Sequence, residues 1–191
     1  MLAVDLVLLP PQKIMEMAVS RNKDLNVQVG QKMILNTTDC LPHISLLMGT
    51  IEEKDMVKIQ GILEELIQDF LPLPMEIRGI KSSTLSGLSV TLSKQLKALH
   101  EIAVQKLKPY FSHLATPDTF FEEVDQKDIE WVNNFTTNAS GDKYWPHITI
   151  GAASQNEVFD KALQFSCSKM AICHLGKYCT CREVLFSKTN L

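Results

Sequence analysis

The order of apolar and polar positions divides the chain into short strands and helices. Continuous or alternating apolar runs predict strands, and apolar residues that recur every three or four positions predict helices. We expect strands at residues 3–9, 43–49, 75–80, 85–92, 147–152, 169–175 and 179–187, and helices at 13–22, 52–70, 94–108, 125–135 and 156–165. Part of 23–39 and most of 110–143 show no clear period and are expected to form loops.

Two local signals mark where helices should begin. Thr50 and Glu53 have the spacing of a capping box ahead of the helix at 52–70. Ser93 stands directly before the helix at 94–108, where a serine side chain can accept a hydrogen bond from a free backbone N–H.

The predicted elements repeat in one order. A strand, a helix and two further strands occupy 43–92, and the same succession is predicted for 147–187. This pattern predicts an α+β protein of two pseudo-symmetric lobes, each a small, mainly antiparallel sheet backed by helices. No linker separates the lobes, so we expect residues 1–191 to form a single bilobal domain.

Composition and charge narrow the class of protein. The 191 residues are 45% hydrophobic and 21% charged, which is ordinary for a globular protein. A net charge of −3 argues against a protein that coats nucleic acid, but a small nucleotide or an RNA end remains possible.

Targeting and redox signals favour a cytoplasmic location. The apolar run from Leu2 to Leu9 contains Asp5 and follows no basic residue, so it is read as a strand rather than a signal peptide. No stretch approaches the roughly 18 apolar residues that a membrane span needs. The five cysteines are odd in number and mostly crowded near the C-terminus, which argues against a secreted disulfide framework.

A short motif occurs twice, as Pro-His-Ile-Ser at 42–45 and Pro-His-Ile-Thr at 146–149. Side chains alternate between the two faces of a strand, so His43 shares a face with Ser45, and His147 shares one with Thr149. Each strand therefore presents an imidazole and a hydroxyl on one face and aliphatic side chains on the other. Two such strands across a cleft suit acid–base chemistry on a phosphoryl group.

On these paired His-x-Ser/Thr motifs the chain resembles the two-histidine (2H) phosphoesterases, a superfamily that includes bacterial 2′-5′ RNA ligases and cyclic phosphodiesterases. Residues 3–11, the hairpin at 75–92 and the helix at 96–107 are also similar to elements of that family. The resemblance weakens between 112 and 143, which is longer and more irregular than the family pattern.

The resemblance implies a central cleft lined by both motifs and catalysis without a metal or other cofactor. It implies hydrolysis or transfer at a ribonucleotide 2′,3′-cyclic phosphate or 2′-5′ phosphodiester. His43 and His147 would divide the roles of general acid and general base, in an order that the sequence leaves open. Ser45 and Thr149 would bind the phosphate oxygens.

Residues next to the second motif are candidate substrate contacts. Lys143 could supply a counter-charge for phosphate, and Tyr144 and Trp145 an aromatic surface for a base; packing in the core or on the surface is the alternative for the aromatic pair. Lys32, Arg78 and Lys81 are further candidate cations without a positional argument. His100 is expected to face solvent from the helix at 94–108.

Two other functions remain open. The same cleft could belong to a non-catalytic module that binds RNA ends or nucleotides. His174 among Cys167, Cys173, Cys179 and Cys181 suggests a zinc-stabilised interaction protein. However, Cys173 and His174 point to opposite faces of a strand, which favours buried thiols over a zinc site. The sequence indicates no protein partner, and a monomer is expected.

Overall fold

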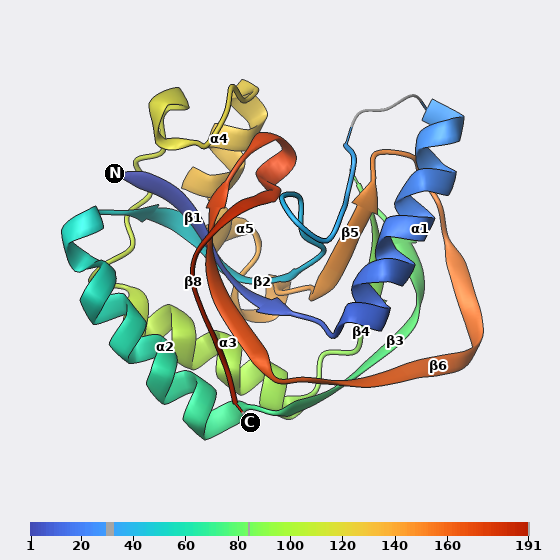
Figure 1. The fold of residues 1–191 in the computed structure, drawn as a ribbon, viewed down its shortest axis with the longest axis horizontal. Coiled ribbons are helices and arrows are strands. Elements are labelled where there is room, and N and C mark those ends of the chain that lie inside the picture. The colour runs from blue at the N-terminus through green and yellow to red at the C-terminus, as the bar shows by residue number, and fades with distance from the viewer. Residues whose placement is uncertain (30–32, 84, 191) are drawn as a thin grey trace.

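Two four-stranded antiparallel sheets form the framework of the protein (Figure 1). The computed structural model describes residues 1–29, 33–83 and 85–190. The first sheet has the order β2-β1-β7-β8, with β1 (Leu2–Leu9), β2 (Ile44–Ile51), β7 (Lys169–Leu175) and β8 (Cys181–Thr189). The second has the order β5-β4-β3-β6, with β3 (Leu73–Ser82), β4 (Ser86–Val90), β5 (His147–Gly151) and β6 (Glu157–Cys167). The predicted α+β fold with two pseudo-symmetric lobes is therefore confirmed.

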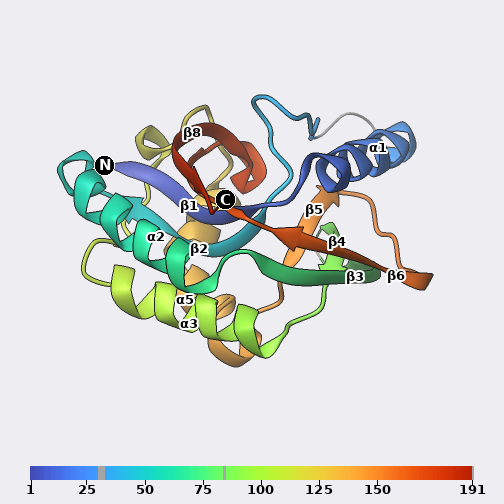
Figure 2. The same ribbon diagram turned by 60° about the horizontal axis from the view of Figure 1, so that its bottom comes forward.

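Helices cover both sheets. They are α1 (Gln12–Val29), α2 (Met56–Phe70), α3 (Lys94–Leu107), α4 (Gln126–Asn133) and α5 (Phe135–Asn138), with 3-10 turns η1 (Glu53–Asp55), η2 (Pro117–Thr119), η3 (Gly141–Lys143) and η4 (Lys177–Cys179). α1 packs against β5 of the second sheet, and α3 packs against β2 of the first. α2 and α3 lie side by side (Figure 2). α2 also contacts β7 and β8.

One continuous hydrophobic core joins the two sheets. It includes Leu6 and Ile44 from the first sheet and Ile77 and Ile148 from the second, all fully buried. A fully buried aliphatic side chain stabilises the fold by about 1.5–3 kcal/mol. The lobes therefore share their main core, and a smaller buried cluster that includes Val7 and Ala171 packs on the first sheet.

The predicted helix at 156–165 is wrong, because this segment is strand β6. β6 pairs with β3 along most of its length, and its inward side chains include Phe159, Leu163 and Phe165. The strand lies at the edge of its sheet, so alternate side chains face solvent and the apolar signal is weak. The order strand, helix, strand, strand therefore follows only the first histidine motif.

The pseudo-symmetry instead relates the paths that lead into the two histidine strands. In each sheet an inner strand is followed by a helix and then by the edge strand that carries the motif. In the first lobe these elements are β1, α1 and β2. In the second they are β4, α3 and β5, with α4 and α5 between α3 and β5. Both motifs thus occupy an edge of their sheet, where a strand is open to a partner or a ligand on one side.

Two of the remaining boundary predictions differ from the structure and one is confirmed. Ser93 caps α3, because its hydroxyl accepts a hydrogen bond from the Leu96 N–H at 3.1 Å. The capping box at Thr50 is wrong: Thr50 is buried within β2, its hydroxyl lies 2.6 Å from that of Ser112, and α2 begins at Met56. α1 extends to Val29, beyond the predicted 13–22.

The cysteines are divided between a disulfide and free thiols. Cys173 and Cys181 form a disulfide between β7 and β8, so the prediction of free buried thiols is wrong for this pair. Cys40, Cys167 and Cys179 are free and buried. Within residues 1–29, 33–83 and 85–190, no group of three or more His, Cys, Asp or Glu side chains is placed to hold a metal ion.

None of the helices in the described part of the chain combines the length and the apolar character needed to cross a membrane.

Candidate active site

The two histidine strands meet at the boundary between the sheets. β2 and β5 are edge strands of different sheets, and they contact each other. A cavity of about 290 Å³ lies against them, lined by His43 and Ser45 from the first motif and by His147 and Thr149 from the second. The structure thus brings together the four motif residues that the sequence singled out.

Both imidazoles are held in the same way. The Nδ1 atom of His43 lies 2.7 Å from the carbonyl oxygen of Leu41, and that of His147 lies 2.9 Å from the carbonyl oxygen of Trp145. Since a carbonyl oxygen can only accept, each Nδ1 carries the hydrogen. The Nε2 atom of each ring is then the nitrogen that can take up or release a proton.

A third functional group, Asp5, lies beside the first histidine. This residue is fully buried in the middle of β1. Its Oδ2 accepts a hydrogen bond of 2.6 Å from the Ser45 hydroxyl and lies 3.6 Å from His43 Nε2. Sequence reasoning did not assign Asp5 a role. The available signal was an acidic residue in an otherwise apolar, buried strand, which is rare without a partner.

The second histidine is held by an aromatic ring instead. Trp145 stacks on His147, with ring centroids 4.2 Å apart and planes within 18° of parallel, and its Nε1 donates to Ser89 Oγ at 3.2 Å. On β4, Gly87 pairs with Thr149, and a Cβ atom at Gly87 would approach His147 Cδ2 to 2.7 Å. The absent side chain at Gly87 is therefore what makes room for the imidazole.

Tyr144 lines the cavity but is mostly buried, and it supports the first motif strand. Its hydroxyl donates to the backbone oxygen of Ser45 at 3.0 Å, and its ring stacks on His100 at a centroid distance of 3.8 Å. The expectation that His100 faces solvent is wrong, because His100 is buried and its Nδ1 contacts the Leu46 carbonyl at 2.8 Å.

The candidate cations that the structure describes do not line the histidine cavity. Lys143 is exposed on η3, its ammonium donates to the Thr137 carbonyl at 3.0 Å, and it is not among the described residues that line the histidine cavity. Arg78 and Lys81 line a second cavity of about 650 Å³, which shares Trp145 with the first. Lys32 is outside the described residues.

An aromatic wall faces the two motifs, and the sequence did not reveal it. Trp131 on α4, Phe135 on α5 and Tyr178 on η4 line the cavity with Trp145, and Lys127 lies one helical turn before Trp131. Trp131 is 42% exposed, so much of its ring surface is open to a ligand. These residues come from the region where the family resemblance is weak and from a turn more than 40 positions later.

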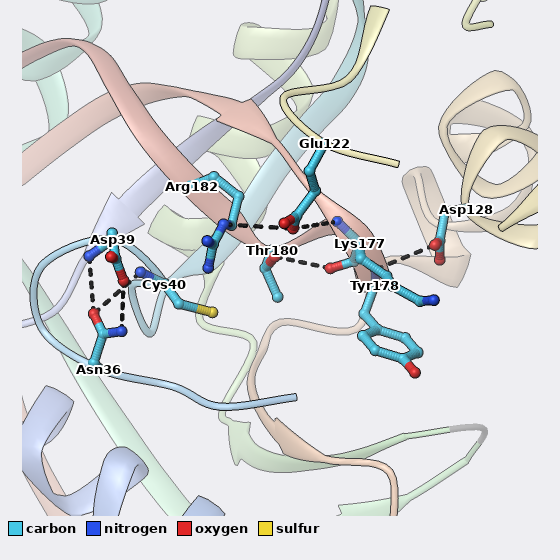
Figure 3. Close-up of polar contacts among 9 residues, drawn as sticks. All are labelled: Asn36, Asp39, Cys40, Glu122, Asp128, Lys177, Tyr178, Thr180 and Arg182. Carbon is cyan, nitrogen blue, oxygen red and sulfur yellow. Dashed lines mark hydrogen bonds and ion pairs between the residues drawn. The ribbon is translucent and has the colours of Figure 1, made fainter. Parts of the chain in front are cut away.

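A polar network holds the turn that carries Tyr178 (Figure 3). Glu122 accepts a hydrogen bond from the Lys177 N–H at 3.0 Å and pairs with Arg182 at 3.4 Å. The Tyr178 N–H donates to Asp128 Oδ2 at 3.2 Å. Tyr178 itself has a left-handed backbone with φ of 59°, a conformation that costs energy for a residue with a side chain. Its place in the cavity wall is thus imposed by the surrounding contacts.

Burial shifts the protonation equilibria of the site. Burial, opposed by the bond to the Leu41 carbonyl and aided by the nearby His147, lowers the pKa of His43 to about 4. Burial also lowers the pKa of His147. The pKa of Asp5 is raised well above its usual range by burial, although the hydrogen bond from Ser45 opposes this shift. Each group is therefore pushed toward its neutral form.

Comparison with known proteins extends the description of the fold. No protein-family model matches the chain, and no curated protein sequence matches it significantly. The crystal structure of TT0787 of Thermus thermophilus is similar over 98% of this chain and 97% of that chain, with 11% sequence identity and a TM-score of 0.60. A crystal structure described as a phosphoesterase is similar over 99% of this chain and 98% of that chain, with 8% identity and a TM-score of 0.49.

These similarities bear on the fold alone. The match to TT0787 shows that essentially the whole chain adopts an architecture found in another protein. Fold and site together define the class: a two-lobed α+β protein in which each lobe places one histidine motif against a shared cavity.

Proposed function

We propose that the protein is a phosphodiesterase that uses His43 and His147 as general acid and general base, without a metal ion. The observation that carries this proposal is the equivalent anchoring of the two rings. Both donate Nδ1–H to the carbonyl two residues earlier, and both line one cavity. Imidazole suits either role, because its unperturbed pKa of about 6.5 is close to neutral pH.

The proposed substrate is a ribonucleotide 2′,3′-cyclic phosphate or a 2′-5′ phosphodiester. The oxygen of water forms a bond to phosphorus as the bond from phosphorus to a ribose oxygen breaks. One histidine takes the proton from water, and the other donates a proton to the departing ribose oxygen. With a ribose hydroxyl in place of water, the same two transfers give ligation or exchange.

The lining of the cavity supports a nucleotide as substrate. Its volume of about 290 Å³ is close to the lower end of typical small-molecule sites. Trp131 and Tyr178 offer aromatic faces on which a nucleobase can stack. Thr149 and Lys127 supply a hydroxyl and a positive charge that suit a phosphate group.

The direct test uses purified protein treated with EDTA and assayed with 2′,3′-cyclic nucleotides and a 2′-5′-linked dinucleotide. We expect turnover of at least one substrate, unchanged by EDTA, and its loss in the His43→Ala/His147→Ala double variant. No turnover of any substrate, or equal turnover by the double variant, would contradict the proposal.

Replacing Trp131 by alanine should raise KM for a nucleotide substrate by roughly 5- to 100-fold, with a smaller change in kcat. The reason is that stacking on an aromatic side chain contributes about 1–3 kcal/mol per base. Steady-state kinetics check this expectation. Phe121→Ala is a matched control, since Phe121 is similarly exposed, at 47%, but does not line the cavity. An unchanged KM for Trp131→Ala would show that Trp131 in the aromatic wall does not contribute to substrate binding.

One observation favours a second function, a module that binds nucleotides or RNA ends without turnover. With the pKa of both histidines lowered, neither ring taken alone would hold the proton that a general acid must donate at pH 7. Tight binding of nucleotides, measured by calorimetry, together with no turnover of any cyclic or linear substrate would establish this function instead.

A further inference from the structure

The two halves of the site differ in whether a carboxyl group lies beside the histidine motif. On the His43 side, Asp5 contacts both motif residues, at 2.6 Å from Ser45 Oγ and 3.6 Å from His43 Nε2. On the His147 side, the neighbouring inner strand places Gly87 opposite Thr149 and Ser89 opposite His147, and neither carries a carboxyl group. Among the described residues, no carboxylate pairs with His147. Asp5 therefore has no counterpart beside His147 among the described residues, and the two motifs are not equivalent in this respect.

We propose that Asp5 is a positioning residue that divides the roles of the two histidines, making His43 the general acid and His147 the general base. This inference rests on the function proposed above. Asp5 does not contact the reacting atoms in this scheme; it acts through His43 and Ser45.

The proton of the acid comes from the Asp5–His43 pair. Two titratable groups this close share protons, and their apparent pKa values belong to the pair. Burial disfavours a charge on either group, so between the two values the pair holds one proton. A phosphate group in the cavity favours that proton on His43, where an imidazolium faces the anion and Asp5 becomes the carboxylate. His43 then passes the proton to the departing ribose oxygen.

Ser45 connects this proton to phosphate binding. While Asp5 is a carboxylate, Ser45 must donate its hydrogen to Oδ2, as the 2.6 Å contact indicates, and offers no hydrogen to the substrate. When Asp5 is protonated, its O–H can donate to Ser45, and the serine hydrogen is free to point into the cavity. The expected role of Ser45 as a phosphate donor thus depends on the state of Asp5, whereas among the described residues no carboxylate forms a hydrogen bond with Thr149.

His147 has the surroundings of a base. Burial lowers its pKa and so favours the neutral ring, its Nδ1–H is held by the Trp145 carbonyl, and Nε2 is left with a lone pair to accept the proton of water. After each turnover His147 carries one extra proton and the Asp5–His43 pair lacks one, so exchange with solvent resets both.

The other titratable groups near Asp5 stay protonated at neutral pH. Burial raises the pKa of Tyr144, and Asp5 adds to the shift. Burial, then Asp128 and Asp5, raises the pKa of Cys179. On β7, Asp5 is paired with Cys173, which is oxidised in the disulfide with Cys181 and does not titrate. The pH dependence of the reaction should therefore report Asp5, His43 and His147.

The first test is the pH profile of Asp5→Asn, which keeps the shape of the side chain and its ability to accept from Ser45. We expect kcat at pH 7 to fall by about 10²-fold with little change in KM. The limb on which activity falls with rising pH should move to lower pH, because His43 alone holds its proton only to about pH 4. Asp55→Asn, which changes a carboxyl on η1 that does not line the histidine cavity, should keep the wild-type shape of the profile.

The second test uses the leaving group and does not depend on the folding of an Asp5 variant. A nucleoside p-nitrophenyl phosphodiester releases a weak base that needs no proton from an acid. His43→Ala should recover most of its activity on this ester relative to a ribose leaving group, and so should Asp5→Asn. His147→Ala should remain defective on both substrates.

The outcomes separate the two proposals. If the wild-type protein turns over no substrate, the proposed function fails. If the wild-type protein is active, but the dependence of kcat on pH has the same shape for Asp5→Asn as for the wild type, Asp5 has only a structural role. If the p-nitrophenyl ester rescues His147→Ala rather than His43→Ala, the roles of the histidines are reversed. Thermal unfolding of each variant shows whether it is folded under the assay conditions.

Discussion

Replacing either His43 or His147 by alanine should lower kcat for the phosphodiester substrate by about 10²–10⁴-fold, which is the usual contribution of a general acid or base. Both rings line the same cavity and both transfer a proton in one reaction, so the remaining histidine contributes little to the rate once the other is absent. The double variant should therefore be only slightly less active than each single variant. Steady-state kinetics on all three variants check this non-additive pattern.

A histidine away from the cavity provides the control. His113 contacts Thr136 Oγ1 at 3.2 Å and does not line the histidine cavity, so His113→Ala should keep the wild-type kcat. A single His43 or His147 variant with near wild-type kcat would show that this ring takes no part in the chemistry. Losses that multiply in the double variant would show that the two rings act independently.

Gly87→Ala should lower kcat by roughly 10²-fold while the protein stays folded. The new Cβ would lie 2.7 Å from His147 Cδ2 and 3.1 Å from its Cβ and Cγ, so the ring or the strand must shift. A displacement of about 1 Å at a catalytic group can cost 10²-fold in rate. Such overpacking should also lower the free energy of unfolding by about 1–3 kcal/mol, as measured by denaturant titration.

Gly61→Ala is the matched control for this substitution. Gly61 is exposed on α2, and a Cβ atom there meets no atom within 4 Å. Alanine is favoured over glycine inside a helix by roughly 0.5–1 kcal/mol, so this variant should gain stability and keep its activity. Full activity in Gly87→Ala would mean that His147 can move without loss, which would contradict its placement as a proton-transfer group.

Much of the fold could be predicted because its signals are local. The spacing of Ile59, Leu63 and Leu66 places one face of α2 in the core, and Ser93 caps α3 as expected. β6 could not be predicted in this way. Its assignment depends on pairing with β3, more than 70 residues earlier, and an edge strand carries too few inward apolar residues to reveal that partner.

In the candidate site, too, the features with local sequence signals could be predicted and those that depend on distant contacts could not. The two Pro-His-Ile motifs could be found because alternation along a strand is a property of neighbouring residues. Asp5 was visible as an acidic residue in an apolar run, but its contact with Ser45 spans 40 positions and depends on how β1 packs beside β2. Tyr144 was a candidate substrate contact, with packing as the alternative; it lines the cavity, and its hydroxyl and ring also contact Ser45 and His100.

The sequence by itself determined that this protein has two histidine motifs on strands of an α+β fold. Alternation and helical spacing follow from backbone geometry within a few residues, and the chain carries both. Only the tertiary structure decided that the motif strands meet at one cavity, that Trp131 and Tyr178 form its wall and that Asp5 stands beside His43 alone. Those contacts join residues far apart in the chain, and they depend on sheet order and register, which no local pattern specifies.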